Sequence, residues 1–364
     1  MARPARGHVC SCTVTHNYSS STRVAVLGAS GFAGGELLRI LARHQGMGLV
    51  AAAASSKVGT PVRDRYPWSS FEGSFVSAED ALGAGADLVF ASLPHTQSME
   101  LLGSWDGPYA VDLGGDFRLR DPGVYLEWFG QDHTHAGALG DWVYGLTEWR
   151  RPDIAAARRV ANPGCYPTAA ILALAPLLAA GAVSAEGIHI DAQSGVSGAG
   201  RATGEGFDFV AVNENLRPYA PTGHKHIAEI EQELSLAAGA TVTVSFVPHL
   251  VPVTRGILAT CTARLTGPAS TEDLVDVFRA RYKEEPFVRV LDAGGPGGLP
   301  ETRRVTGTNV AELAVRADAR TGRAIAMAVI DNLGKGAAGQ AVQNANLMLG
   351  LPETTGLDTA GLAP

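Results

Sequence analysis

Short apolar runs alternate with helical stretches through the first 160 residues of the chain. Runs of strand length occupy residues 23–27, 49–54, 86–91 and 109–113, and a Ser or Gly follows each of them directly. After the first run, Glu36–Leu41 carries apolar residues at the spacing of a helix. Strands that alternate with helices predict a doubly wound parallel sheet covered on both faces. Ligands of such sheets bind beyond the carboxyl ends of the strands.

From about residue 162 the pattern changes. Apolar and polar residues alternate over 187–191 and 241–247, which is typical of strands in a mixed or antiparallel sheet. The apolar run 162–178 opens as a helix, and a last helix is expected over 337–349. The pattern therefore predicts an α/β chain, in which a parallel sheet precedes an α+β domain with a mixed sheet.

Composition narrows the class of protein. The chain has 364 residues, enough for about two domains. Its net charge is −7 without a basic block, so we expect neither nucleic acid nor a membrane as a partner. No apolar run reaches the roughly 18–20 residues that span a bilayer. Four cysteines in this length fit a reducing cytosol, and a cytoplasmic location is expected. Residues 1–22 are predicted to be a disordered extension and residues 351–364 a loose tail.

Glycines follow the first strand at a spacing typical of a dinucleotide site. Gly28, Gly31 and Gly34 form G-x-x-G-x-x-G between a strand and a helix, where glycine lets a pyrophosphate approach the helix N-terminus. The second strand ends in Ser55-Ser56-Lys57, with no carboxylate to hold ribose hydroxyls or to repel a 2′-phosphate. We therefore expect NADP(H) rather than NAD. The alternatives are an ordinary tight turn and a solvated lysine.

One cysteine stands at the entrance of the predicted central helix. Cys165 lies in NPGCYPTA, where unpaired backbone N–H groups and the helix dipole favour a thiolate. A free cysteine is only about 3 % thiolate at pH 7, and the dipole lowers the pKa by roughly one unit. A nearby imidazolium would lower the pKa further, so a histidine is expected beside a reactive thiol. Incidental packing of the cysteine is the alternative.

Two histidines lie at the N-terminal end of another predicted helix. His224 and His226 precede an apolar face formed by Ile227, Ile230 and Leu234. Positions two apart on a helix are separated by about 200°, so at most one imidazole faces the thiol if the turn is regular. A structural role for both is the alternative.

Three arginines lie within glycine-rich or apolar segments of the sequence. Arg118 and Arg255 suit an anionic substrate, and Arg201 suits a bidentate pair with a carboxylate or phosphate. Arg201 directly follows the small residues Gly198-Ala199-Gly200, which permit close approach of a ligand. The alternatives are a salt bridge within the protein for Arg118 and Arg255, and a surface hairpin for Arg201.

Together these segments resemble the N-acetyl-γ-glutamyl-phosphate reductase family, relatives of aspartate-semialdehyde dehydrogenase. The matching segments run in order from about residue 23 to 350: GASGFAGGELLRIL, SLPH, DLGGDFRL, YGLTE, NPGCYPTA, SGVSGAGR, GHKHIAEIEQEL, PHLVPVTRGI and DNLGKGAAGQAVQN. The resemblance implies an NADP-binding Rossmann domain at 23–161, completed by a returning helix at 335–350. It implies a catalytic and dimerisation domain at 162–334.

The resemblance also implies roles for individual residues. Cys165 would be the nucleophile and His226 the acid/base, with His224, Asn162 and Gln193 beside them. Substrate would be bound by Arg118, Arg201, Arg255 and Ser197. Cofactor would be bound by Gly28, Ser30, Gly31, Phe32, Ala33, Ser55, Ser56, Lys57, Ser92, Pro94, Gly198, Ala199, Gly200, Asn332, Gly334 and Lys335. No metal site is expected.

The implied reaction is the NADPH-dependent reduction of N-acetyl-L-glutamyl 5-phosphate to the 5-semialdehyde and inorganic phosphate, through a cysteine thioester, in arginine biosynthesis. A reductase of a related acyl phosphate, such as aspartyl phosphate or a carrier-bound aminoadipyl phosphate, is one alternative. A non-catalytic NADP-binding sensor is another. A homodimer or homotetramer is expected from the family.

Overall fold

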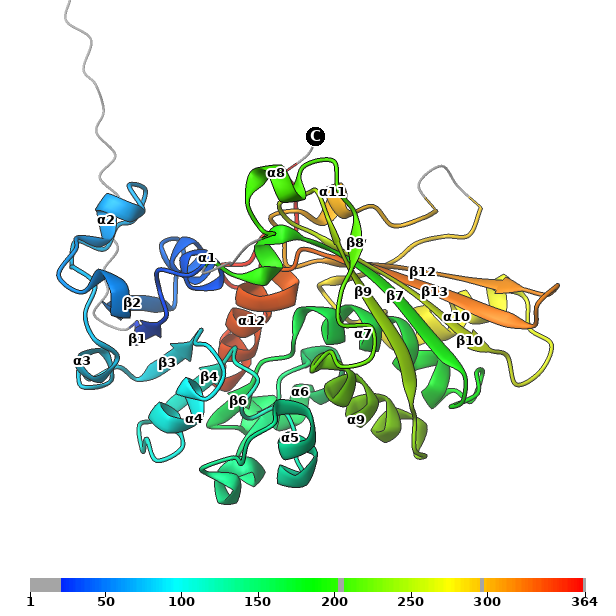
Figure 1. Cartoon of the computed structure of the whole chain (residues 1–364), viewed down its shortest axis with the longest axis horizontal. Coiled ribbons are helices and arrows are strands. Elements are labelled where there is room, and N and C mark those ends of the chain that lie inside the picture. Colours follow the sequence, from blue (N-terminus) through cyan, green and yellow to red (C-terminus); the bar gives the residue numbers. More distant parts are fainter. Residues whose placement is uncertain (1–20, 202–205, 295–297, 363–364) are drawn as a thin grey trace, which may run out of the picture.

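The computed structural model describes residues 21–201, 206–294 and 298–362. Within them two sheets lie next to each other, with α12 (Gly339–Met348) between them (Figure 1). The predicted extension lies outside the described residues up to residue 20. The first strand already begins at Thr22, inside the range expected to be disordered.

The first sheet is parallel throughout its six strands, in the order β2-β1-β3-β4-β6-β5. These strands are β1 (Thr22–Leu27), β2 (Met47–Ala52), β3 (Leu88–Ala91), β4 (Tyr109–Asp112), β5 (Val143–Tyr144) and β6 (Arg159–Ala161). Each of the four apolar runs predicted as strands in this half forms one, which confirms the prediction that strands alternate with helices here.

Helices cover both faces of this sheet. Val24 and Val26 of β1 pack in a core with α1 and α12, whereas Ala25 and Leu27 pack in a second core with α3 and α4. The helical segments of this half are α1 (Phe32–Leu41), η2 (Ser55–Lys57), α2 (Val62–Arg65), α3 (Ala78–Leu82), α4 (Gln97–Leu102), α5 (Pro122–Phe129), η3 (Ala136–Asp141) and α6 (Thr147–Ala156). The last helix of the chain thus returns to the first sheet, as the resemblance implies.

Residues 351–362 are not a loose tail, which corrects the prediction for this part of 351–364, and residues 363–364 lie outside the described residues. Leu357 packs on the core shared by α1 and α12. Glu353 forms an ion pair with Arg151 at 3.0 Å, and Asp358 forms one with Arg43 at 2.7 Å. Through residue 362 the segment therefore lies against the protein, because its apolar and acidic side chains have partners there.

The second sheet is mixed and has seven strands in the order β11-β12-β13-β10-β7-β9-β8. Its strands are β7 (Ile188–Gly195), β8 (Arg217–Pro218), β9 (Val244–Val251), β10 (Ile257–Arg264), β11 (Val288–Val290), β12 (Ala311–Asp318) and β13 (Arg323–Ile330). The pairs β7–β9 and β11–β12 are parallel, and the other pairs are antiparallel.

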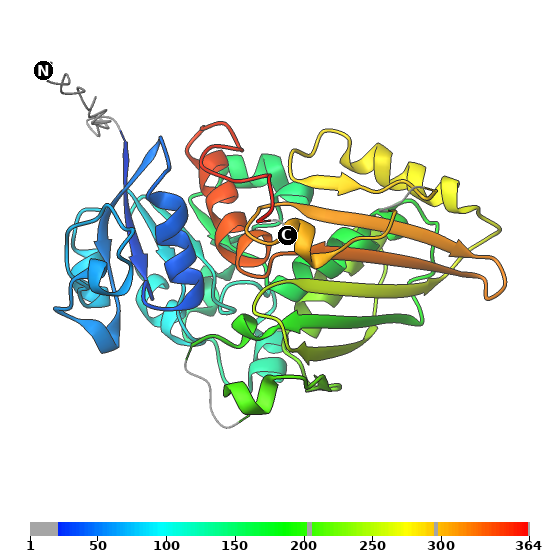
Figure 2. The same ribbon diagram turned by 90° about the horizontal axis from the view of Figure 1, so that it is seen from above.

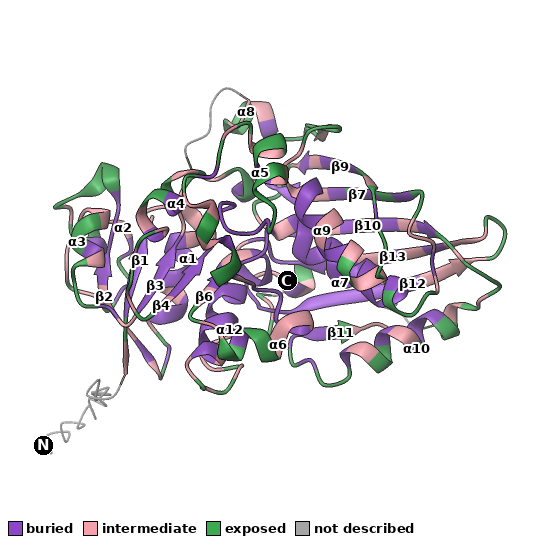
Figure 3. Cartoon of the chain, turned by 90° about the horizontal axis from the view of Figure 1, so that it is seen from below, coloured by how far each residue is buried: buried purple, intermediate pink, exposed green. Residues whose placement is uncertain are grey.

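Three long helices cover one face of the mixed sheet: α7 (Cys165–Ala179), α9 (His226–Ala238) and α10 (Thr271–Tyr282). The shorter segments of this half are η4 (Val196–Ala199), α8 (Phe209–Val212), α11 (Thr302–Val305) and the π-helical turn η5 (Gly334–Ala338). Every residue of α7 from Tyr166 to Leu178 is buried, so this helix lies at the centre of the molecule (Figure 3).

The opposite face of the mixed sheet is largely uncovered (Figure 2). Along β7, Ile188, Ile190 and Ala192 are buried against the helices, whereas His189 and Asp191 are exposed. Strand alternation therefore places Ser194 on the helix-covered face and Gln193 on the other. Among the residues that the model describes, no helix is long and apolar enough to span a membrane.

Candidate active site

Cys165 is the first residue of α7, and its side chain is half-buried. Gly164 precedes it as the N-cap, and the Gly164 backbone N–H donates to Glu229 Oε1 at 2.7 Å. On another side, Gly336 of η5 packs so closely that a β-carbon there would lie 2.9 Å from the Cys165 β-carbon. The thiol therefore lies where the start of α7 approaches α9 and η5.

His226 is the histidine nearer to the start of α7. A β-carbon built on Gly164 would lie 2.6 Å from His226 Nε2, so this nitrogen faces the residue before the thiol. His226 Nδ1 is buried without a hydrogen-bond partner among the described residues. His224 Nδ1 accepts from the His226 backbone N–H at 3.2 Å. This bond orients the His224 ring and leaves His226 Nε2 directed at the thiol region.

Both imidazoles line one cavity, and their ring centroids are 4.7 Å apart. The separation of about 200° expected from a regular helical turn does not apply. The reason is that α9 begins only at His226, and His224 lies in the loop before it. His224 also makes edge contacts with Tyr166 and Phe246, so its ring lies among aromatic side chains.

Glu229 joins the start of α7 to α9 and was not predicted from the sequence. It follows His226 by one turn and is 2 % exposed. Besides the Gly164 N–H, its carboxylate accepts from the Tyr144 hydroxyl at 2.7 Å and from Arg118 Nη1 at 3.2 Å. A buried carboxylate with three donors is a rigid anchor, because each lost contact would leave a charge unsatisfied. Glu229 therefore fixes the position of the helix that carries the thiol.

The protonation states differ from the thiolate expected at a helix start. Burial raises the pKa of the Cys165 thiol to about 11, and the nearby Arg118 charge offsets this only in part. Burial also lowers the pKa of His224 to about 4, and it lowers the pKa of His226 well below its usual range. His224, Arg118 and His95 add to the effect on His226 through like charge. At neutral pH the pair is thus a thiol beside neutral imidazoles, because desolvation outweighs the helix dipole.

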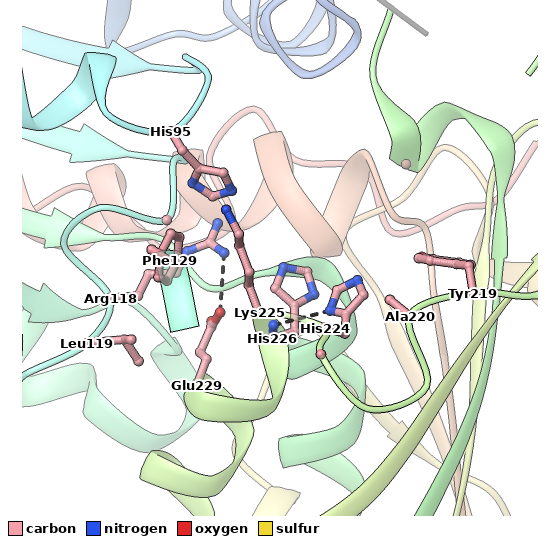
Figure 4. Close-up of a pocket in the computed structure, with 13 residues that line it drawn as sticks. His95, Arg118, Leu119, Phe129, Tyr219, Ala220, His224, Lys225, His226 and Glu229 are labelled. Carbon is pink, nitrogen blue, oxygen red and sulfur yellow. Dashed lines mark hydrogen bonds and ion pairs between the residues drawn. The ribbon is translucent and has the colours of Figure 1, made fainter. Parts of the chain in front are cut away.

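A cavity of about 340 Å³ opens beside these groups. His224 and Tyr219 lie at one end, and His95, Arg118 and Lys225 lie at the other, with His226 between them (Figure 4). This volume is within the range typical of small-molecule sites.

The glycine loop has the features of a dinucleotide cradle. Gly28 has φ +72°, and a β-carbon there would lie 2.0 Å from the Ser92 carbonyl oxygen, so only glycine fits. No side chain caps α1, whose first N–H groups are the usual partners of a phosphate. Ser55, Ser56 and Lys57 are exposed after β2. These residues fit a dinucleotide that carries an additional phosphate.

The structure also brings the two predicted cofactor segments together. The Arg201 guanidinium lies 4.4 Å from the centre of the Phe32 ring, at the start of α1. Arg201 therefore lies against the first residue of α1, although 169 positions separate it from Phe32 in the chain. Arg201 contacts the cofactor side of the molecule rather than the cavity lining.

Three predicted polar side chains already have partners inside the protein. Asn162 was expected beside the nucleophile, but its Nδ2 donates to the Ala337 carbonyl and its Oδ1 accepts from Asn344. The Lys335 ammonium was expected at the cofactor, but it is fully buried and donates to Glu148 and Gln343. The side-chain roles predicted for Asn162 and Lys335 are therefore wrong. Asn332 was also expected at the cofactor, but it donates to Ser197 Oγ and accepts from the Gly256 N–H, so both of its amide atoms are engaged.

Arg255 follows the alternative that the sequence left open for it. It forms ion pairs with Glu36 of α1 at 3.1 Å and with Asp331 at 3.0 Å. It therefore ties the glycine-loop helix to the end of β13 and does not line the cavity. For Arg118 both expected positions apply, because it forms an ion pair with Glu229 inside the protein and also lines the cavity.

Gln193 faces away from Cys165, so its predicted place beside the nucleophile is wrong by one residue. The helix-covered face of β7 presents Ser194 instead, and this serine interacts with Tyr166 of α7. Gln193 Oε1 is buried without a partner among the described residues, and so is Nδ1 of His249, the residue paired with it on β9. Counting the alternation from Ile190 would have assigned these two positions correctly.

Comparison with known proteins places the chain in a family. Residues 23–157 match the model of the semialdehyde dehydrogenase NAD-binding domain, and residues 165–332 match that of the semialdehyde dehydrogenase dimerisation domain. Solved structures of similar fold include aspartate semialdehyde dehydrogenase II from Vibrio cholerae, with a TM-score of 0.69, 19 % identity and coverage of 91 % of this chain and 99 % of that one. The Candida albicans enzyme with NADP has a TM-score of 0.64 at 17 % identity, over 90 % and 98 % of the two chains.

Sequence relatives are much closer. N-acetyl-gamma-glutamyl-phosphate reductase of Symbiobacterium thermophilum is 50 % identical over 345 residues, which cover 93 % of this chain and 98 % of the relative. The protein of the same name from Frankia casuarinae is 48 % identical over 94 % of this chain and 99 % of its own length. The chain therefore belongs to the N-acetyl-gamma-glutamyl-phosphate reductase family of semialdehyde dehydrogenases.

Proposed function

We propose that this chain reduces N-acetyl-L-glutamyl 5-phosphate to N-acetyl-L-glutamate 5-semialdehyde and inorganic phosphate, with NADPH, in arginine biosynthesis. The observation that carries the proposal is the position of His226 Nε2 against Gly164, directly before Cys165, at a cavity with cationic groups. A thiol, a neutral imidazole and an anion-binding wall are the groups that acyl transfer from an acyl phosphate requires. The names of the relatives supply the substrate.

The first step is attack by Cys165 on the acyl carbon. Because the thiol is protonated in the free protein, His226 Nε2 accepts the proton as the sulfur–carbon bond forms. A neutral imidazole suits this role, since a protonated one has no lone pair to offer. The carbon–oxygen bond to phosphate then breaks, its electron pair leaves with the phosphate, and a thioester remains on Cys165.

Backbone N–H groups in the first turn of α7 are placed to stabilise the oxyanion, since Asn162 is engaged elsewhere. When bound, NADPH supplies the hydride that reduces the thioester carbonyl. As the aldehyde carbonyl re-forms, the carbon–sulfur bond breaks, its electron pair stays on the sulfur, and His226 returns the proton to it. Glu229 holds Arg118 and the helix start in place throughout.

We propose that the cofactor binds along the glycine loop and beside Arg201, which contacts Phe32 at the start of α1. Gly28 and the uncapped start of α1 would hold the pyrophosphate, and Ser55, Ser56 and Lys57 would hold the 2′-phosphate. The remaining predicted positions here, Ser30, Gly31, Phe32, Ala33, Ser92, Pro94 and Gly334, stay predictions. So do the domain boundaries at 161/162 and 334/335.

We further propose that a second copy of the chain covers the open face of the mixed sheet. The dimerisation model covers residues 165–332, which include all seven strands of this sheet, and the unpartnered atoms of Gln193 and His249 lie on this face. Dimer or tetramer, and a cytoplasmic location, stay predictions.

The test is oxidation of N-acetylglutamate 5-semialdehyde by the full chain, followed as NADPH formation that depends on inorganic phosphate. We expect Cys165→Ser to lower the rate by about 10⁴-fold or more, because an alcohol is a poor nucleophile beside a neutral imidazole. Cys261→Ser is the matched control, since Cys261 is buried in β10 away from the cavity. Full activity of the Cys165 variant would refute the mechanism, and a preference for aspartate semialdehyde would refute the substrate.

A further inference from the structure

A fully buried lysine lies in the turn that packs on Cys165. The side chains of Lys335 and Glu148 are both 0 % exposed, and the Lys335 ammonium donates to Glu148 Oε1 at 2.5 Å and to Gln343 Oε1 at 2.7 Å. The next residue, Gly336, is the one that packs against the Cys165 β-carbon. None of the catalytic steps described above uses this buried charge.

The turn η5 has an uncommon geometry. The backbone N–H groups of residues 336 and 338 donate to the carbonyls five positions earlier, both at 2.9 Å, which is the spacing of a π-helix. Such turns are rare and are found frequently at functional sites. A β-carbon on Gly334 would lie 2.1 Å from the Thr308 carbonyl oxygen, and one on Gly336 would lie 2.9 Å from the Cys165 β-carbon. The turn therefore fits tightly between Thr308 and the start of α7.

Polar contacts hold this turn at its start, middle and end. At the start, the buried Asp331 carboxylate accepts from two successive backbone N–H groups at 2.8 and 3.1 Å. At the end, the Ala337 carbonyl accepts from Asn162 Nδ2 at 3.2 Å. Lys335 makes the middle contact, and it joins the turn to α6 and to α12 (Figure 1).

Stability alone does not account for this buried ion pair. Burial raises the pKa of the Glu148 carboxyl, but the Lys335 charge and the hydrogen bonds to the carboxylate together hold it below its usual value, so the pair is ionised. Desolvating both charges costs about as much as their attraction returns, and an apolar pair of similar volume is often at least as stable. What the ion pair adds is a fixed distance and direction between the turn and α6.

We propose that Lys335 is a positioning residue, which acts through η5 to hold Cys165 in place for attack on the acyl carbon. The inference rests on the proposed function, in which Cys165 is the nucleophile. Without the ammonium, the turn is free to shift away from the start of α7, and Cys165 loses the surface that supports it. A displacement of about 1 Å at a reacting group lowers a rate by about 100-fold.

The first test needs no substrate. Lys335→Met should increase alkylation of Cys165 by iodoacetamide at pH 8 by about three- to tenfold, because a thiol that is less buried ionises more readily. Labelling of Cys261, followed separately by peptide mass spectrometry, should stay slow, since Cys261 is fully buried in β10. Equal acceleration at both cysteines, or none at Cys165, would overturn the proposal.

A double variant separates position from stability. Lys335→Met combined with Glu148→Met leaves no lone buried charge, so most of the melting temperature lost in Lys335→Met should return. Labelling of Cys165 should nevertheless stay at least about threefold faster than in the wild type, because an apolar pair does not fix the turn. Labelling at the wild-type rate would show that the pair only stabilises the fold, and would overturn the proposal.

Arg150→Met is the matched control for the loss of a cation. Arg150 also belongs to an ion pair of α6, but its partner is Glu233 of α9 at 3.0 Å rather than a residue of η5. Its Cys165 labelling should stay within about twofold of the wild type. An increase as large as that of Lys335→Met would overturn the proposal, because any broken ion pair of α6 would then have the same effect.

The same variant should have a distinct kinetic signature in the phosphate-dependent oxidation. We expect Lys335→Met to lower kcat by about 10- to 100-fold and to leave the KM for NADP⁺ within about threefold, because the ammonium contacts Glu148 and not the cofactor. A raised KM for NADP⁺ with an unchanged kcat would overturn the proposal. A wild type without phosphate-dependent turnover would refute the proposed function instead, and the labelling test would still decide whether Lys335 positions Cys165.

Discussion

At the glycine loop, the groups that would meet a ligand are neighbours in the sequence. Gly28 and the start of α1 lie within five residues, and Ser55, Ser56 and Lys57 are consecutive and exposed. Around the thiol, the contacting groups come from residues 118, 144, 164, 226, 229 and 336, and nearly all are buried. Backbone shape and local motifs build the first site, whereas a long-range polar network builds the second. The two sites should therefore respond differently to substitution.

The largest effect should come from breaking the network at Glu229. We expect Glu229→Gln to lower kcat/KM by about 100-fold, because the start of α7 and Arg118 lose their common anchor. It should also cost about 3 kcal/mol of unfolding free energy, as expected when one partner of a buried ion pair is removed.

Glu233→Gln is the control for this variant, since Glu233 lies one turn further along α9 and pairs with Arg150 at 3.0 Å. Its stability loss should be comparable, but kcat/KM should change by no more than about threefold. If both variants lost activity equally, general destabilisation would explain the result and the anchoring role of Glu229 would be wrong.

The next effect concerns the protonation of Cys165. With a thiol pKa raised to about 11, the reactive thiolate is a fraction of about 10⁻³ at pH 8, and this fraction rises as protons are removed. We therefore expect the rate of alkylation by iodoacetamide to increase about tenfold per pH unit from about pH 7 to about pH 10. Cys165→Ser supplies the background from the other cysteines. A rate that is flat above about pH 6 would instead indicate the thiolate–imidazolium pair that the sequence suggested.

The smallest effect is expected at the glycine-loop side. Lys57 is exposed, so Lys57→Met should raise the KM for NADPH by only about three- to tenfold and leave kcat unchanged. The KM for NADH should not change, because NADH lacks the 2′-phosphate. Lys283→Met controls for the loss of one positive charge, because Lys283 is exposed at the end of α10. Equal effects on both cofactors would remove Lys57 from the 2′-phosphate site.

The sequence predicted what depends on local pattern. The parallel strands, the mixed sheet, the helix that begins at Cys165 and the glycine cradle all follow from periodicity and turn residues over short windows. The thiolate favoured by the sequence and the raised thiol pKa in the structure differ, because the helix dipole is visible in the sequence but the depth of burial is not. Asn162 and Lys335 were misassigned for a related reason. Their partners, Asn344 and Glu148, lie more than 180 residues away.

Some of the missed residues did leave a signal. Glu229 interrupts the apolar face of Ile227, Ile230 and Leu234 one turn after His226, and a carboxylate in that position is expensive to bury without a partner. Gln193 could have been placed by counting alternate residues along β7. His95 and Lys225 had no such signal, because their common position at the cavity depends on how three separate loops meet.

Several ion pairs cross between the halves of the chain, among them Glu36 with Arg255, and Glu148 with the fully buried Lys335. Each joins residues that the two family models assign to different domains or leave after them. Chimeras that exchange the amino-terminal half between relatives must therefore keep the residues of each pair together. A crossover near residue 160 would separate the partners of each pair. Wherever the two parent sequences differ at a paired position, a buried charge would then be left without its partner. Halves of related chains can be exchanged only if both residues of each of these ion pairs come from compatible sequences.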